Sequence, residues 1–308
     1  MHAWKKVLLW TIAAAYTLIT GMRVQAQNRG VYPLGMSAIN SGITPAPGFS
    51  YSNQLLYYSR DEAKDNDGNN LPVTGLNYVL MDMNSFTWVS KDEILGAHYS
   101  ATATLPFAKN DLTSDLHGNI SGGAGFADSY YMPLILGWSR ERAAVRVIYG
   151  FLAPTGRFAA DSNSNVGSGY WTHTISSGQT FYPTRGKFLA LSAFEMYEFH
   201  TTQEGTGVHP GETFDLDYSA LASVLGAGRF RLQIGPAGYE ARQTTAKTGP
   251  QVSLVESKNR YAINALGFAL SVAFPRRKAS LNLKYFKEFA DRSTFQGYSL
   301  QFSGATTF

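Results

Sequence analysis

The chain has 308 residues, of which 14% are aromatic and 16% charged, and it contains no cysteine. The lack of cysteine excludes disulfides, a structural zinc finger, an iron–sulfur cluster and a cysteine nucleophile. Three of the 26 basic residues and none of the 22 acidic ones lie in residues 1–26, so the charges of the remaining chain nearly cancel. This balance, without a basic run interleaved with aromatic residues, argues against a nucleic-acid partner.

The first 26 residues have the pattern of a secretory signal peptide. Lys5 and Lys6 form a basic start, residues 7–20 are apolar, and Val24-Gln25-Ala26 ends in small residues of the kind a signal peptidase cuts. We expect the mature chain to begin at Gln27. The alternative, an N-terminal membrane anchor, needs about 20 apolar residues, and this run is shorter.

Residues 27–48 are rich in Gly, Pro, Ser and Asn. We interpret them as a periplasmic lead-in, or a plug segment that enters the domain behind it. Residues 49–308 alternate apolar and polar positions in about twelve segments, the pattern of a transmembrane β-barrel. These predicted strands lie near 49–60, 73–87, 94–106, 128–138, 143–153, 169–182, 187–200, 212–224, 229–242, 259–274, 279–289 and 295–308.

The connections between these strands alternate in length. Short turns are predicted at 90–93, 139–142, 183–186, 226–228 and 275–278. Longer polar loops are predicted at 61–71, 109–125, 156–167, 201–211 and 243–258. Bacterial outer-membrane barrels have short periplasmic turns and long outer loops. The sequence therefore predicts an all-β fold, a transmembrane antiparallel β-barrel of about 12 strands in the outer membrane of a Gram-negative bacterium.

The hairpin within residues 127–158 shows the alternation most clearly. Its second strand places Val145, Val147, Tyr149 and Phe151 on one face. Its first strand places a matching apolar set on one face, and the set consists of Tyr130, Met132, Leu134, Leu136 and Trp138. Aromatic residues at both ends of such faces are typical of strands that contact lipid, because aromatic rings settle at the two membrane interfaces.

The same hairpin carries a resemblance to a known family. The motifs are YYMPLILGW from Tyr130, APTGRF from Ala153 and GSGYWT from Gly167. They resemble the outer-membrane transporters of the meta-pathway of phenol degradation, the MetA-pathway phenol degradation-like proteins. Phe126-Ala127 stands where that family's pattern has Gly-Asp. The resemblance covers residues 48–308 and implies passive uptake of small aromatic or hydrophobic compounds that feed a degradation pathway.

Polar side chains on the opposite faces of the strands are predicted to point inward, because acids facing lipid would be costly. They could filter solutes, or they could form internal ion pairs that fill a narrow barrel. Lys284 and Glu288 are the pair expected to bridge through a neighbouring strand. The lumen-facing candidates are His98, Arg146, Asp215, Asp217, Arg231, Gln233, Lys284 and Glu288.

The C-terminal strand ends in a phenylalanine and resembles the signal that the barrel-insertion machinery reads. Its residues of one parity include Tyr298, Leu300, Phe302 and Phe308. Outer-membrane lipid and lipopolysaccharide are the other expected partners. The acidic run in residues 61–67 could contact lipopolysaccharide through bridging cations, or could simply be a solvated loop.

Three functions remain open from the sequence. The first is a channel for small aromatic or hydrophobic solutes, without cofactor or metal. The second is a structural or adhesive barrel without transport. The third, an outer-membrane lipid hydrolase, needs a serine nucleophile activated by a histidine. His98 points inward by parity and no Gly-x-Ser-x-Gly motif occurs, so we predict that the chain is not an enzyme.

Overall fold

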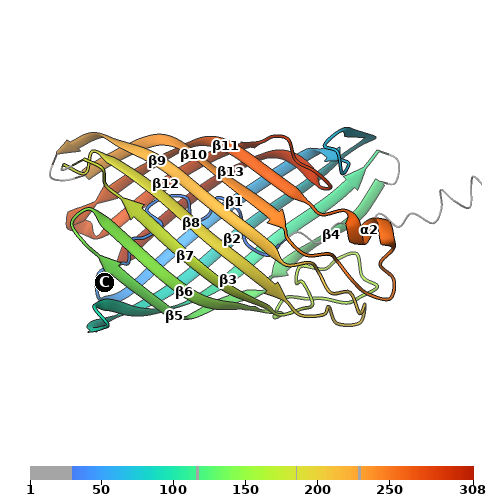
Figure 1. Cartoon of the computed structure of the whole chain (residues 1–308), viewed down its shortest axis with the longest axis horizontal. Coiled ribbons are helices and arrows are strands. Elements are labelled where there is room, and N and C mark those ends of the chain that lie inside the picture. The colour runs from blue at the N-terminus through green and yellow to red at the C-terminus, as the bar shows by residue number, and fades with distance from the viewer. Residues whose placement is uncertain (1–29, 116–117, 185, 228–229) are drawn as a thin grey trace, which may run out of the picture.

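The computed structural model describes residues 30–115, 118–184, 186–227 and 230–308 as a closed antiparallel β-barrel (Figure 1). Its strands are β1 (Gly48–Lys64), β2 (Asn70–Ile94), β3 (Ala97–Ser114), β4 (Gly118–Phe126), β5 (Ser129–Ser139), β6 (Ala143–Ala153), β7 (Thr172–Phe181), β8 (Leu189–His200), β9 (Thr213–Ala227), β10 (Phe230–Gln243), β11 (Ala262–Phe274), β12 (Ala279–Glu288) and β13 (Phe295–Thr307). Both β4 and β5 pair with β3, so these two strands share one position of a 12-strand barrel. The predicted fold class is confirmed.

The two ends of the barrel differ. Short connections and the C-terminus lie at one end, which we call the turn end (Figure 1). The longer connections lie at the other, the loop end, together with helix α2 (Leu254–Lys258). A short 3-10 helix, η1 (Pro275–Arg277), makes one of the turns. No helix within the described residues is long and apolar enough to cross a membrane. The predicted signal peptide lies outside the described residues.

The first three strands are longer than the sequence predicted. The predicted loops at 61–71 and 109–125 are mostly strand, because β1 and β2 continue to a turn at residues 65–69, β3 extends to Ser114, and β4 begins at Gly118. The predicted turn at 90–93 lies instead at Leu95 and Gly96, both with positive φ. Polar residues mark the end of a lipid-facing face, but backbone pairing can continue beyond the membrane.

The alternation in β5 is interrupted by a bulge. The register with β6 shifts between Tyr131 and Leu134. Side chains before the shift, Tyr130 and Met132, line the lumen, whereas Leu134 after it is 44% exposed on the outer face. One extra residue moves every following side chain to the other face. The prediction that Tyr130 and Met132 share a face with Leu134 is therefore wrong.

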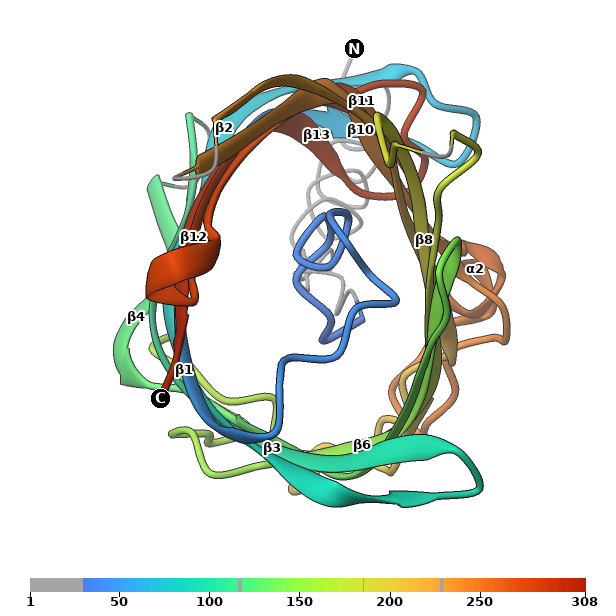
Figure 2. The ribbon, with the colours of Figure 1, turned by 90° about the vertical axis from the view of Figure 1, so that its left-hand side faces the viewer.

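Residues 30–47, which we call the lumen segment, lie inside the ring of strands (Figure 2). The segment begins near the loop end, where the Gly30 amide donates to the Tyr261 hydroxyl at 2.7 Å. It ends at Gly48, the first residue of β1, at the turn end. A turn in which the Met36 amide donates to the Pro33 carbonyl needs a left-handed residue, and Gly35 has φ +83°.

Candidate functional site in the barrel lumen

Two barrel carboxylates bind the half of the lumen segment that lies toward the loop end. Glu198 of β8 accepts the backbone amides of Val31 and Tyr32 at 2.9 and 2.7 Å. Asp217 of β9 accepts the amides of Gly35 and Ser37 at 2.8 and 2.9 Å, and also the Tyr32 hydroxyl. The segment has little regular structure of its own, so these carboxylates satisfy backbone groups that would otherwise be buried without partners.

Basic side chains hold the backbone carbonyls of the same segment. The Lys284 ammonium of β12 donates to the carbonyls of Gly35 and Met36 at 2.6 and 2.7 Å. Arg146 of β6 donates to the carbonyl of Ser41 at 2.8 Å. Neutral side chains complete the set, and they are Tyr58, Gln301, Ser219 and Thr180. The barrel interior thus supplies acceptors for the segment's amides and donors for its carbonyls.

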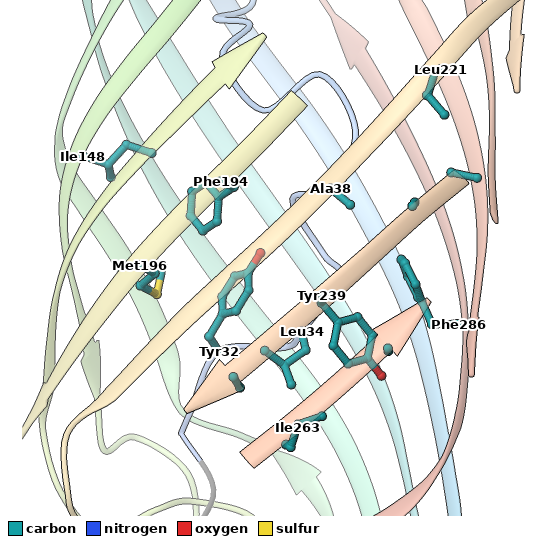
Figure 3. Close-up of a cluster of buried hydrophobic side chains, with 14 of the residues drawn as sticks. Tyr32, Leu34, Ala38, Ile148, Phe194, Met196, Leu221, Tyr239, Ile263 and Phe286 are labelled. Carbon is teal, nitrogen blue, oxygen red and sulfur yellow. The ribbon is translucent and has the colours of Figure 1, made fainter. Parts of the chain in front are cut away.

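Apolar packing adds to these bonds (Figure 3). Tyr32 stacks on Phe194 of β8 with ring centroids 5.4 Å apart. Leu34 and Ala38 are buried in the same cluster. Near the turn end the fit is tight, because a Cβ added to Gly42 would lie 2.0 Å from the backbone oxygen of Ala144. The lumen segment is therefore packed as part of the core and fills the part of the lumen in which it lies.

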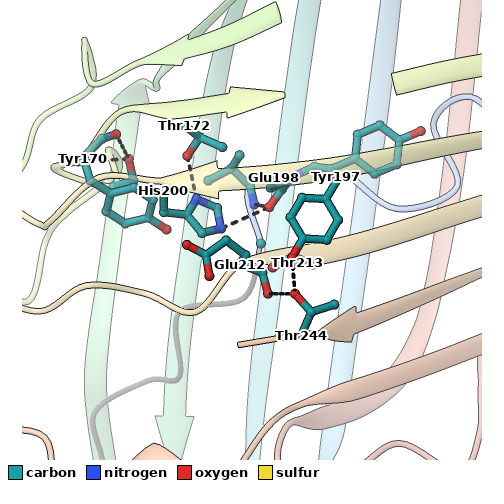
Figure 4. Close-up of polar contacts among 12 residues, drawn as sticks. Tyr170, Thr172, Tyr197, Glu198, His200, Glu212, Thr213 and Thr244 are labelled. Carbon is teal, nitrogen blue, oxygen red and sulfur yellow. Dashed lines mark hydrogen bonds and ion pairs between the residues drawn. The ribbon is translucent and has the colours of Figure 1, made fainter. Parts of the chain in front are cut away.

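A buried polar row lies at the loop end of β7 and β8 (Figure 4). The Thr172 hydroxyl contacts Nδ1 of His200 at 2.8 Å, and Nε2 of His200 lies 3.5 Å from the Glu198 carboxylate. This order of hydroxyl, imidazole and carboxylate resembles that of a hydrolase. Thr172 is fully buried, however, and Glu198 is engaged by the lumen segment. The row offers no accessible nucleophile.

A cavity of about 1210 Å³ lies between the lumen segment and the wall formed by β1 to β8. Its lining extends from Asp161 and Lys247 in the loops to Pro45 and Thr87 toward the turn end. Burial lowers the pKa of Lys247 in the loop between β10 and β11. The cavity therefore runs along much of the barrel beside the segment.

The cavity lining changes character along its length. On β2, Val79, Met81 and Met83 line the part of the cavity nearer the loop end, and Ser85 and Thr87 line the part nearer the turn end. The two hydroxyls pair with those of Thr104 and Thr102 on β3, each at 2.8 Å. Further apolar residues face it from the lumen segment and the opposite wall, and they are Met36, Met132, Ile148, Phe194 and Met196. The lining thus combines thioethers and aromatic rings with hydroxyl groups.

Two more of the predicted lumen residues are buried inside the barrel. Asp215 of β9 is 2% exposed, and within the described residues its Oδ2 has no hydrogen-bond partner. Gln233 of β10 is buried and reaches the Ser223 hydroxyl at 3.5 Å. His98 lies near the turn end, 3.8 Å from Glu93, and Arg231 is exposed at that end. His98 and Arg231 thus lie away from the lumen segment's acidic partners.

The expected bridge between Lys284 and Glu288 is wrong. Lys284 is occupied by the lumen segment, as described above. Glu288 instead pairs with Arg60 of β1 at 3.0 Å and also accepts the Tyr239 hydroxyl and the Gly297 amide. The sequence could not show this partner, because Arg60 is 228 positions away from Glu288. The two side chains come close only because the closed barrel brings β1 near β12.

The remaining predicted residues lie on the outside or in loops. Tyr298, Leu300 and Phe302 of β13 are between 37% and 47% exposed on the outer face, and Phe308 follows the strand. Their role as an insertion signal stays a prediction. In the acidic run, Asp65 accepts the amides of Asp67 and Asn69, and the hydrogen bond from Asn69 leads in lowering the pKa of Asp65. The described residues contain no group of three or more acidic or histidine side chains that could hold a metal ion.

Sequence reasoning missed Asp128, which joins the three motifs of the hairpin region. It lies between β4 and β5, and its carboxylate accepts the amides of Gly156 and Ser168 at 2.8 and 2.6 Å. These bonds hold the connection of residues 154–171 over the free edge of β4, where the Gly122 amide donates to the Asn163 carbonyl at 2.8 Å. The signal in the sequence is glycine at positions 156 and 167, where an added Cβ would lie 3.0 and 2.8 Å from Oδ1 of Asp128.

Asp128→Ala is expected to release residues 154–171 from the barrel edge. Each lost bond between a carboxylate and an amide contributes about 1.5–3 kcal/mol. Trypsin should therefore cut at the exposed Arg157 faster in outer membranes that carry this variant. Asp161→Ala, in the same connection, is the control and should cleave at the wild-type rate. Equal rates for both variants would contradict the role of Asp128.

The comparisons with known proteins agree with this architecture. Residues 60–303 match the sequence profile of the MetA-pathway of phenol degradation family. None of the curated proteins matches the chain. The crystal structure of the COG4313 outer membrane channel from Pseudomonas putida F1 is similar over 87% of this chain and 98% of that one, with 12% identity and a TM-score of 0.73. The beta domain of the Bordetella autotransporter BrkA is similar over 85% of this chain and 100% of that one, with 13% identity and a TM-score of 0.51.

Proposed function

Because the chain belongs to the MetA-pathway of phenol degradation family and is an outer-membrane channel-like barrel, we propose that it admits small aromatic or hydrophobic compounds by passive diffusion. The observation that carries the proposal is the cavity beside the lumen segment, which extends from the loops toward the turn end. No cofactor and no enzymatic step is part of the proposal. The lumen segment acts as a plug that narrows the route.

The cavity lining supports this class of solute. A flat ring gains contact with polarizable methionine sulfurs and aromatic side chains, and a hydroxyl or carboxyl substituent can bond to the serine and threonine hydroxyls. A sugar of the same size gains less at Val79, Met81 and Met83, because these side chains offer its hydroxyl groups no hydrogen bonds. The lining therefore favours solutes with one polar end.

Met83→Gln tests the selectivity directly. Met83 is buried at the cavity wall, and an amide there places unpaired polar atoms against an aromatic solute. In liposomes that contain the purified protein, we expect toluate to enter faster than a pentose sugar. The variant should slow toluate several-fold and leave the sugar unchanged. Leu283→Gln, on the outer face, is the control.

The outcomes separate the candidate functions. Equal entry of toluate and sugar would mean an unselective pore. Entry of neither solute, with a barrel that still shifts in electrophoresis on heating, would remove transport and favour a structural or adhesive role. If the same preparation hydrolysed lipid, and the Thr172→Val variant did not, the result would support the lipid-hydrolase function instead.

A further inference from the structure

A group of polar side chains lies on the lipid-facing side of β1 and β2. Residues directly opposite each other on paired strands have side chains on the same face of the sheet. Asp82 is opposite Leu55, which is 42% exposed on the lipid side, so Asp82 also points outward. Asn84 lies two residues further along β2 and shares this face. Asn53 of β1, opposite Asn84, and Tyr51 complete the outer polar cluster. The Asn53 amide donates to both Asp82 and Asn84, and the Tyr51 hydroxyl donates to Asn84 at 2.7 Å.

Asp82 lies midway between the two aromatic belts. Along β2, Asp82 is four residues from Tyr78 and four from Phe86. Tyr78 contacts Tyr57 toward the loop end, and Phe86 contacts Tyr51 toward the turn end. Four residues of a tilted strand cover about 10 Å of membrane depth, so the carboxylate sits near the centre of an apolar band of about 25 Å. Lipid chains offer this group no partner.

The cluster is complementary to itself. Within the described residues, its own bonds leave the Asn84 amide nitrogen as a donor and the second Asp82 oxygen as an acceptor. In a two-fold dimer any contact between the donor of one copy and the acceptor of the other occurs twice, because residue i meets residue j and residue j meets residue i. We infer that two copies of this chain associate in the membrane through the β1–β2 face, with the outer polar cluster at the centre of their contact.

A second polar group on the lipid side gives an internal comparison. Glu195 of β8 accepts the Ser177 hydroxyl and the Gln179 amide at 2.8 and 2.9 Å, and the same amide also donates to Ser177. All donors of this group are therefore used within it. Two copies of the group would present only acceptors to each other. It offers no self-complementary contact, although it too carries a carboxylate.

Single cysteines test the inference, because the chain has none of its own. Leu55→Cys lies beside Asp82, Val147→Cys on an apolar outer face of β6, and Ala193→Cys beside Glu195. On oxidation in native outer membranes, Leu55→Cys should form a linked dimer several-fold more than either control. Adding Asp82→Leu or Asn84→Leu should reduce the dimer to the control level.

Each alternative outcome overturns the inference. Equal linking at all three positions would indicate random collision. Linking at Ala193→Cys as strong as at Leu55→Cys would show that any lipid-facing carboxylate draws contacts. A dimer that persists in both leucine variants, each shown by heat-dependent electrophoretic shift to be folded, would mean that the polar cluster does not hold it.

Discussion

Replacing Glu198 and Asp217 together with alanine is expected to raise the single-channel conductance several-fold in planar bilayers. The two carboxylates accept four backbone amides of the lumen segment and the Tyr32 hydroxyl, and each such bond contributes about 1.5–3 kcal/mol. Without them the segment exposes unpaired amides to the lumen wall. It should then leave its place for much of the time and widen the route.

Asp215→Ala is a matched control for this experiment. Asp215 lies on the same face of β9, two residues from Asp217, and is equally buried, but it makes no hydrogen bond to the lumen segment. The single-channel conductance of the Asp215→Ala variant should match that of the wild type. If the double variant also conducts like the wild type while remaining a folded barrel, the segment is held mainly by packing and by Lys284.

The second large effect concerns stability. Arg60→Met should lower the free energy of unfolding by about 3–5 kcal/mol, because it leaves the Glu288 carboxylate buried without its cation. The ion pair is 3.0 Å long and both side chains are almost fully buried. Unfolding in urea, followed by tryptophan fluorescence in detergent micelles, measures the change.

The double variant Arg60→Met/Glu288→Leu should recover most of this loss, because an apolar pair needs no charge compensation. Lys64→Ala provides the comparison with a more exposed pair. Its ammonium lies 2.7 Å from Glu62 at the loop end, where such a pair contributes no more than about 1 kcal/mol. If Arg60→Met and Lys64→Ala lowered stability equally, the buried pair would not be a special element of the barrel.

The sequence alone could determine the barrel and most of its inward and outward faces. Lipid strongly favours apolar side chains, and backbone pairing continues around a closed ring, so apolar and polar residues alternate with period two along most strands. This reasoning placed Asp217 and Lys284 inside and Tyr149 and Phe302 outside. It failed at β5, where a single bulge between Tyr131 and Leu134 reverses the faces without changing the composition.

The tertiary structure alone decided what the inward residues do. Asp217 and Lys284 are 67 positions apart in the chain, yet both hold the turn around Gly35. Glu288 pairs with Arg60 because closure of the barrel brings β12 and β1 to either side of β13. Such partners are set by register and by the path of the lumen segment through the ring. No local pattern records these contacts, because the side chains that make them come from strands far apart in the sequence.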